Sequence, residues 1–209
     1  MYLMTKLLAT IALLFITLNS FSQNNNNDSF GISVGSGESG IYTLGKSVGG
    51  PGNIGLSSIE IGLNYYHPLN QSLYFESGFY WHHNKIKITP GVNPGAILTP
   101  RYTNLNFFYI PLNLKMKFLK YFFIDGGLLL NLDVSTHSDI SNQTAIGADF
   151  GFGIEIPVFK HYSISINPFV NIHELFKLDR HDLGESIIGD GVRLTLKINT
   201  PHLKGITRN

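Results

Sequence analysis

The chain contains no cysteine, and this absence excludes several kinds of site at once. Without thiols there is no disulfide framework, no thiolate zinc site, no cysteine nucleophile and no cysteine-linked lipid anchor. Charged residues are also scarce: they make up 14% of the 209 residues, whereas the surface of a soluble domain carries roughly 25–35%. Lysine and arginine number 15 against 14 acidic residues. No basic excess attracts nucleic acid, so we expect no nucleic-acid partner.

Long apolar runs are absent except near the start of the chain. There, one lysine precedes an apolar run from Leu7 to Leu18, and the small-x-small pattern Ser20–Ser22 follows. This arrangement is typical of a secretory signal peptide, and the run of about 12 residues is shorter than the ~20 that a spanning helix needs. We predict a signal peptide over residues 1–22, cleavage before Gln23, and a disordered polar leader over residues 23–28. An uncleaved membrane anchor is the alternative.

The chain is rich in apolar and polar residues that alternate with a period of two. From Phe122 to Val134, every even-numbered position is apolar or glycine, whereas Asp125, Asn131 and Asp133 lie at odd-numbered positions. Such alternation predicts strands with two unlike faces. The pattern recurs in eight segments, over residues 30–35, 56–66, 73–88, 102–118, 122–134, 146–158, 162–175 and 187–198.

The connections between these segments alternate in length. Three are tight turns, at residues 68–71, 118–120 and 159–161. The longer ones are rich in Gly, Pro, Asn, Asp and Ser, and cover residues 37–53, 89–100, 137–142 and 177–185. Long and short connections therefore lie at opposite strand ends. We predict an all-β fold: an eight-stranded antiparallel up-and-down transmembrane β-barrel over residues 29–199, followed by a C-terminal tail over residues 200–209.

Aromatic residues lie near both ends of the predicted strands, as in the girdles of membrane barrels. Those near the short turns are Tyr65, Tyr66, Phe118, Tyr121, Phe159 and Tyr162, and those near the other end are Phe79, Tyr80, Trp81, Tyr102, Phe107 and Phe169. The polar face consists mainly of glycine, asparagine and serine, which suits a crowded lumen better than a water-facing surface. A soluble lipocalin-like ligand-binding barrel, with its apolar face inward, is the alternative.

The segment from Phe108 to Leu132, FYIPLNLKMKFLKYFFIDGGLLLNL, resembles a hairpin of PorT-like outer-membrane β-barrel proteins. In that hairpin a strand ending in I-P-L-x-L-K is followed by a short turn, an aromatic strand, a glycine pair and leucine. Gly147 to Pro157 (GADFGFGIEIP) is similar to the next strand of the family. The resemblance covers most of residues 29–199. It implies the outer membrane of a Gram-negative cell and motivates a role in a secretion or motility assembly.

The polar face places ten ionisable residues inside the predicted barrel: Glu60, Glu76, Lys115, Lys117, Asp125, Asp133, Asp149, Glu155, Arg193 and Lys197. An eight-stranded barrel is only wide enough for side chains to fill, so these charges must be paired or hydrogen-bonded. Distance from the short turns predicts one structural cluster that plugs the lumen, formed by Glu76, Lys115, Asp125, Glu155 and Arg193. We expect Glu155 or Glu76 to pair with Arg193. A gate or proton path is the functional alternative.

One pattern suggests catalysis. His161-Tyr162-Ser163 matches the His-x-Ser spacing of the lipid A deacylases among eight-stranded outer-membrane barrels. In that chemistry the histidine acts as base and the serine as nucleophile, so a lipid A-modifying hydrolase is an alternative function. The pair lies at a short turn, on the periplasmic side, whereas lipid A lies in the outer leaflet. We therefore predict no catalytic residues and no enzyme.

Metal binding is the other chemistry to weigh. His82 and His83 are adjacent on a strand, so they point to opposite faces and cannot chelate one ion. A loop metal site near the external end is an alternative, and its candidate ligands are His137, His173, Glu174, Asp179, His181 and Asp182. Polar loop residues are the ordinary explanation, and we predict no metal site and no cofactor.

These observations predict a monomeric, non-enzymatic outer-membrane barrel with a lumen filled by side chains. Its expected partners are outer-membrane lipid and envelope proteins, reached through external loops or periplasmic turns. Two roles fit: a structural or surface-interaction protein, and a component of an envelope assembly.

Overall fold

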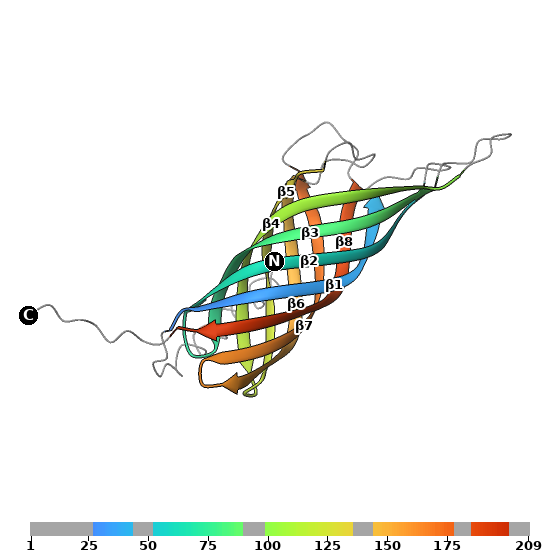
Figure 1. Ribbon diagram of the computed structural model, residues 1–209. Helices are drawn as coiled ribbons and strands as arrows, with labels where there is room; N and C mark the ends of the chain where they lie inside the picture. Colours follow the sequence, from blue (N-terminus) through green and yellow to red (C-terminus); the bar gives the residue numbers. More distant parts are fainter. Residues whose placement is uncertain (1–26, 44–51, 90–98, 136–143, 178–184, 201–209) are drawn as a thin grey trace, which may run out of the picture.

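The computed structural model describes residues 27–43, 52–89, 99–135, 144–177 and 185–200. They hold eight antiparallel strands in a closed barrel, in which consecutive strands pair and the last strand pairs with the first (Figure 1). The strands are β1 (Ser29–Thr43), β2 (Gly52–Pro68), β3 (Leu73–Thr89), β4 (Arg101–Phe118), β5 (Phe122–Asp133), β6 (Ala145–Phe159), β7 (Tyr162–Lys177) and β8 (Glu185–Asn199). The predicted up-and-down barrel is confirmed. The signal peptide, its cleavage before Gln23 and nearly all of the tail lie outside the described residues.

The barrel is closed by the pairing of β1 with β8. This pairing runs the whole length of both strands, from Ser29 opposite Asn199 to Thr43 opposite Glu185. Every strand therefore has a partner on both sides, and both described chain ends lie at the same end of the barrel (Figure 1). Lipid cannot satisfy the backbone groups of an open sheet edge, so closure is what a membrane demands of a sheet. No helix among the described residues is long and apolar enough to cross a membrane.

The largest difference from prediction lies in the first hairpin. We expected residues 37–53 to form a loop because they are rich in glycine and serine, but β1 continues to Thr43 and β2 begins at Gly52. The small residues of β1 and β2 in this stretch form part of the barrel wall instead. A side chain on Gly37 would collide with the backbone of β8 at Gly191, which lies opposite in the sheet. This glycine- and serine-rich stretch therefore belongs to strands that approach each other closely, although its composition is typical of a loop.

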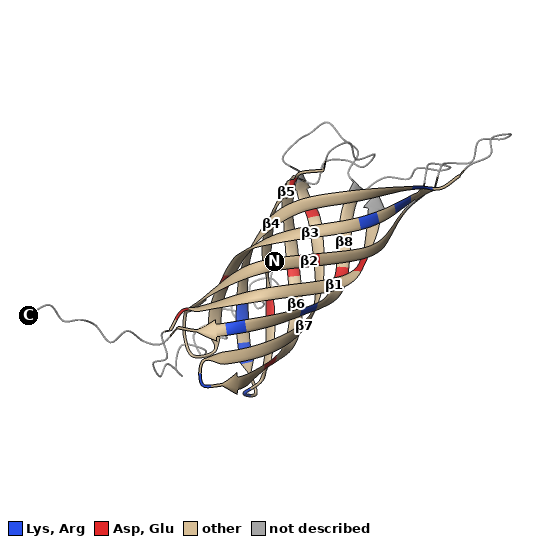
Figure 2. Ribbon diagram, viewed as in Figure 1, with Lys and Arg blue, Asp and Glu red and all other residues tan. Residues whose placement is uncertain are grey.

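The barrel is apolar outside and polar inside. On β5, the side chains of Leu128, Leu130 and Leu132 are 48%, 41% and 56% exposed, whereas Asp125 is 4% exposed. Exposed large apolar residues occur on all eight strands, and most of the strand length in Figure 2 carries no charge. A soluble lipocalin-like barrel would have the reverse arrangement. A continuous apolar outer band around a closed sheet is the surface of a transmembrane β-barrel.

The aromatic residues that we assigned to the girdles fall on both faces of the wall. Tyr66, Tyr80, Phe107 and Phe169 are buried in the interior, so their assignment to the girdles is wrong. The assignment considered only distance from the strand end, whereas the pleat turns every second residue inward. Of the remaining members, Phe118, Tyr121, Phe159 and Tyr162 are exposed near the short turns and Tyr102 near a long connection, whereas Phe79 and Trp81 are exposed in the middle of β3.

The outer face makes a direct prediction for Leu130, which pairs with Ile110 in the middle of β4. Leu130→Arg places a cation on the lipid-facing wall, at a cost of roughly 2–4 kcal/mol near the midplane. We expect the variant to insert poorly into lipid vesicles, measured as the fraction that shows the folded band on an unheated gel. Leu119→Arg is the matched control, because Leu119 is exposed in the short turn after β4. Equal insertion of both variants would mean that Leu130 does not face lipid.

Candidate functional site

The type of side chain that faces the interior changes along the barrel axis. On β8, the inward-facing residues from the short-turn end upward include Lys197, Arg193 and Ile187, all buried. They belong in turn to a lysine-rich group, a mid-barrel ion pair and an apolar cluster. The strand fixes this order, because residues two apart share a face and rise along the wall.

The short-turn cluster gathers three lysines around one carboxylate. Lys117 Nζ donates to Glu155 Oε1 at 2.6 Å, Lys115 Nζ lies 3.1 Å from Glu155 Oε2, and Lys197 Nζ lies 3.6 Å from Glu155 Oε1. The pleat explains the arrangement, because Lys115 and Lys117 are two apart on β4 and point the same way. Ser163 on β7 lies between Glu155 and Lys197, pairs with Lys197 across the β7–β8 ladder, and donates its hydroxyl to Glu155 Oε1 at 3.3 Å.

Aromatic rings stabilise the lysines that the single carboxylate cannot neutralise. Lys115 Nζ lies 3.7 Å from the centroid of the Phe123 ring. Lys117 and Lys197 both lie 4.8 Å from the centroid of the Tyr74 ring. The negative face of an aromatic ring attracts a cation, and more strongly where water is excluded.

The mid-barrel cluster centres on a buried ion pair. Arg193 Nε donates to Glu60 Oε1 at 2.6 Å, and the Tyr109 hydroxyl donates to Glu60 Oε2 at 2.7 Å. Asp149 Oδ2 lies 3.8 Å from Arg193 Nη1 and accepts from Asn113 at 2.5 Å. The guanidinium also lies against two rings, those of Tyr80 and Phe169, at 4.9 and 4.5 Å from their centroids.

Gly35 explains why Glu60 and Arg193 meet. Gly35 on β1 pairs with Glu60 on β2 on one side and with Arg193 on β8 on the other. A side chain on Gly35 would occupy the space that the Glu60 carboxylate fills. Two residues 133 positions apart in the chain therefore face each other across a position without a side chain.

All five residues of the predicted charge cluster lie buried in the interior. They do not form one cluster, because they have different partners. Lys115 pairs with Glu155 in the short-turn cluster, whereas Arg193 belongs to the mid-barrel cluster. Glu76 accepts from the amide of Asn64 at 3.0 Å, and Asp125 accepts from the amide of Asn167 at 2.9 Å. Our expectation that Glu155 or Glu76 pairs with Arg193 is wrong, because the β1–β8 closure brings Glu60 there instead.

Several rings point inward in the part of the barrel near the long connections, and we did not predict this from the sequence. The His82 ring stacks on Phe107 with centroids 4.8 Å apart, and His173 meets the same ring edge-on at 4.5 Å. His173 Nδ1 lies 3.1 Å from Asn131 Oδ1. The alternation along β3 could have placed His82 inside, because His82 and Glu76 are both at even-numbered positions and therefore share a face of the strand. His173 is thus a wall residue with its ring in the interior.

Of the remaining candidate ligands for a loop metal site, one lies on a strand and the others lie outside the described residues. Glu174 is buried on β7 beside His173. His137, Asp179, His181 and Asp182 lie outside the described residues. Within the part of the chain that the structure describes, no three His, Asp or Glu side chains are grouped to hold a metal ion.

Apolar side chains occupy much of the interior towards the long connections. They form one buried cluster with the upper aromatic rings: Tyr80, Ile86, Ile88, Leu105, Phe107, Tyr109, Leu129 and Ile187. The described interior therefore contains ions at the short-turn end and in the middle. Towards the long connections, apolar side chains lie together with buried polar groups such as His82, Asn84 and Asn131.

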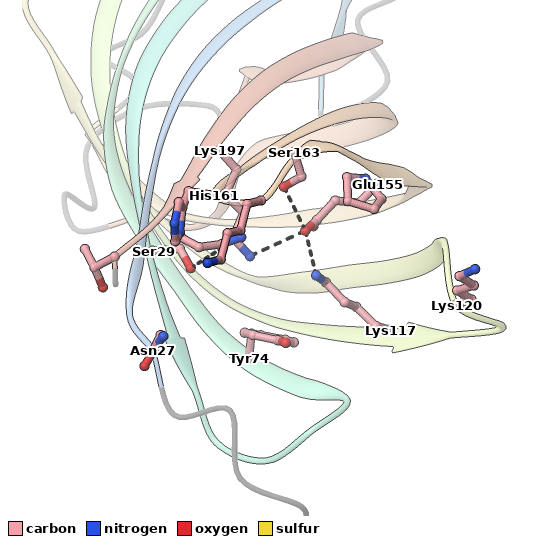
Figure 3. Close-up of a pocket in the computed structure, with 13 residues that line it drawn as sticks. Asn27, Ser29, Tyr74, Lys117, Lys120, Glu155, His161, Ser163 and Lys197 are labelled. Carbon is pink, nitrogen blue, oxygen red and sulfur yellow. Dashed lines mark hydrogen bonds and ion pairs between the residues drawn. The ribbon is translucent and has the colours of Figure 1, made fainter. Parts of the chain in front are cut away.

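A pocket opens at the short-turn end, with a volume of about 520 Å³ (Figure 3). Its walls are Asn27, Ser29, Tyr74, Lys117, Lys120, Glu155, Pro157, Lys160, His161, Ser163, Lys197, Asn199 and Thr200. His161 and Ser163 both line it, but the Ser163 hydroxyl donates to Glu155. A serine nucleophile must instead donate to its base, so this pair is not arranged as the hydrolase hypothesis requires.

Comparison with known proteins finds likeness in shape alone. No family model and no curated protein matches the chain. Ail of Yersinia pestis, solved with the heparin analogue sucrose octasulfate, has a TM-score of 0.44 and 10% identity, over 83% of this chain and 99% of its own. AlkL in DMPC lipid bilayers gives 0.46 and 13%, over 90% and 97%. OprG of Pseudomonas aeruginosa gives 0.45 and 11%, over 83% and 97%.

The buried Arg193–Glu60 pair leads to a prediction about stability. Arg193→Met leaves the Glu60 carboxylate buried without its cation, which typically costs about 3–5 kcal/mol. We expect the free energy of unfolding in urea, followed by fluorescence of the single tryptophan Trp81, to fall by that order. Adding Glu60→Gln should recover part of the loss, because it removes the stranded charge. Two additive losses would show that the residues do not act as a pair.

Removing the charge of a buried carboxylate should lower the free energy of unfolding for Glu155 but not for Asp125. Glu155→Gln leaves three lysines without their shared anion, so we expect a loss of about 3–5 kcal/mol. Asp125 is held by an amide, and no cation within ion-pair distance of it is found among the described residues. Asp125→Asn should therefore be neutral or stabilising, because burying an unpaired charge is costly. A large loss in both variants would show that Asp125 also depends on a cation.

Proposed function

We propose that this protein is an outer-membrane barrel that does not conduct and acts through its two ends. The short turns face the periplasm and the long connections face outward, as in other transmembrane barrels. The signal peptide, cleaved before Gln23, delivers the chain to the envelope, and the barrel is a monomer bounded by lipid. The filled interior is the observation that supports this proposal most strongly.

Packed side chains, both apolar and polar, fill the interior of the described barrel. The mid-barrel pair of Arg193 and Glu60 is buried, and the apolar cluster with Ile86, Leu105 and Ile187 lies above it. An ion that entered from the short-turn end would have to leave water and pass these packed side chains, at a high desolvation cost. The charges therefore act as a structural plug, rather than as a gate or proton path.

The leading role is that of a component of an envelope assembly. Support comes from the PorT-like pattern from Phe108 to Leu132 and from the charged pocket at the periplasmic end. A surface-interaction role through the external connections is the second candidate. Cross-linking in cells from a cysteine placed at Lys120, in the turn between β4 and β5, separates the two roles. An assembly component is captured with a periplasmic partner, whereas a surface protein is not.

A lipid A-modifying hydrolase fits the site poorly. The His161–Ser163 pair faces the pocket at the short-turn end, and its serine hydroxyl is engaged by Glu155. We therefore propose a non-enzymatic protein.

Conductance gives a sharp test. Purified protein in planar bilayers should show no large steady current, and unheated protein should migrate differently from heated protein on a denaturing gel. The gel shift proves that the barrel is folded, so a silent bilayer cannot be explained by misfolding. A wide, stable channel from folded protein would contradict the plug and make the protein a pore.

A further inference from the structure

The pocket at the short-turn end carries an excess of positive charge. Four lysines line it, Lys117, Lys120, Lys160 and Lys197, together with one carboxylate, Glu155. The formal excess is three positive charges, four minus one. Figure 3 shows Lys117 of β4 and Lys197 of β8 directed towards Glu155 of β6, with Lys120 farther out at the turn between β4 and β5.

The inner wall of this pocket is held in place before any ligand arrives. The side chains of Lys197 and Glu155 are only 3% and 7% exposed. Lys197 lies over two tyrosine rings, and Lys117 is fixed by its 2.6 Å hydrogen bond to Glu155. Cations that are already positioned lose little conformational freedom when they bind an anion, which favours affinity. Lys120 and Lys160, which lie in the turns, remain exposed at the rim.

The deeper carboxylates do not cancel this charge inside the pocket. Glu76 and Asp125 do not line it, and they accept from the amides of Asn64 and Asn167. The pocket also offers a neutral donor, the side-chain amide nitrogen of Asn199, whose amide oxygen accepts from the Ser29 hydroxyl at 2.9 Å. Ammonium groups with an amide donor suit a phosphate, whose several oxygens accept hydrogen bonds and whose charge is multiple.

We propose that this pocket binds a phosphate-bearing ligand presented from the periplasm. Only the direction of access depends on the proposed function, since the pocket belongs to the barrel itself. The volume of about 520 Å³ falls within the range of small-molecule sites and exceeds the size of a single phosphate. The ligand is therefore a phosphorylated small molecule or the headgroup of an anionic phospholipid, and both share the same chemistry at the lysines.

The test uses inorganic pyrophosphate as the probe, titrated calorimetrically into detergent-purified barrel at constant ionic strength. The wild-type protein should bind one pyrophosphate saturably. The rim variant Lys120→Gln/Lys160→Gln should bind about tenfold more weakly, because it removes two nearby positive charges. The matched control is Lys85→Gln/Lys87→Gln, which removes two lysines from β3 near the opposite end. This control should bind like the wild type.

A second variant tests the inner wall. Lys197→Met should abolish measurable binding, and its heat-dependent gel shift reports whether the barrel still folds. If it does not fold, the rim variant alone decides. No saturable binding by the wild type, or equal weakening in the rim variant and the control, would overturn the proposal. Because these titrations are made in detergent, they can fail without bearing on the location or conductance of the barrel.

The source of the phosphate is separated in lipid nanodiscs. Pyrophosphate binding is compared in discs of phosphatidylcholine alone and in discs that also contain phosphatidylglycerol. Weaker binding in the anionic discs means that a lipid headgroup occupies the pocket, whereas unchanged binding assigns it to a soluble phosphorylated ligand.

Discussion

The pairing of β1 with β8 is the constraint on which the rest of the structure depends. It removes the last open edge of the sheet, which a lipid environment demands. Its register also sets Gly35 between Glu60 and Arg193, so the central ion pair exists because the barrel closes in this way. The same closure brings the start of β1 and the end of β8 together. There, Ser29, Asn199 and Thr200 line the short-turn pocket.

A narrow barrel with lipid outside has to place its polar groups in a confined space. The described interior satisfies them in different ways along its axis: Glu155 with three lysines, Glu60 with Arg193 and a tyrosine, and Asp125 with an amide. Towards the long connections, an apolar cluster lies together with buried polar groups such as His82 and Asn84. The excess of cations is confined to the short-turn end, and it is there that we place a ligand rather than in the middle of the barrel.

Period-two alternation was sufficient to predict most strands and both faces of the wall, as in β5, where Leu130 is exposed and Asp125 buried. It failed for β1, because glycine and serine in a wall look like glycine and serine in a loop. It also could not show that Arg193 meets Glu60. Alternation tells which way a side chain points, but its neighbour across the barrel depends on strand stagger, which is set by closure. His82 and Tyr80 could have been placed inside by parity with Glu76.

A single-cysteine scan of β5 tests most directly that the apolar face of the barrel is outside and that its lumen is filled. The chain has no native cysteine, so one spin label can be placed at each position in turn. In lipid vesicles, labels at Leu128, Leu130 and Leu132 should be accessible to oxygen dissolved in the bilayer. Labels at Asp125, Leu129 and Asn131 should be inaccessible both to oxygen and to a water-soluble relaxation agent. The reverse alternation would contradict the orientation of the faces, and access of the water-soluble agent to Leu129 would contradict the filled lumen.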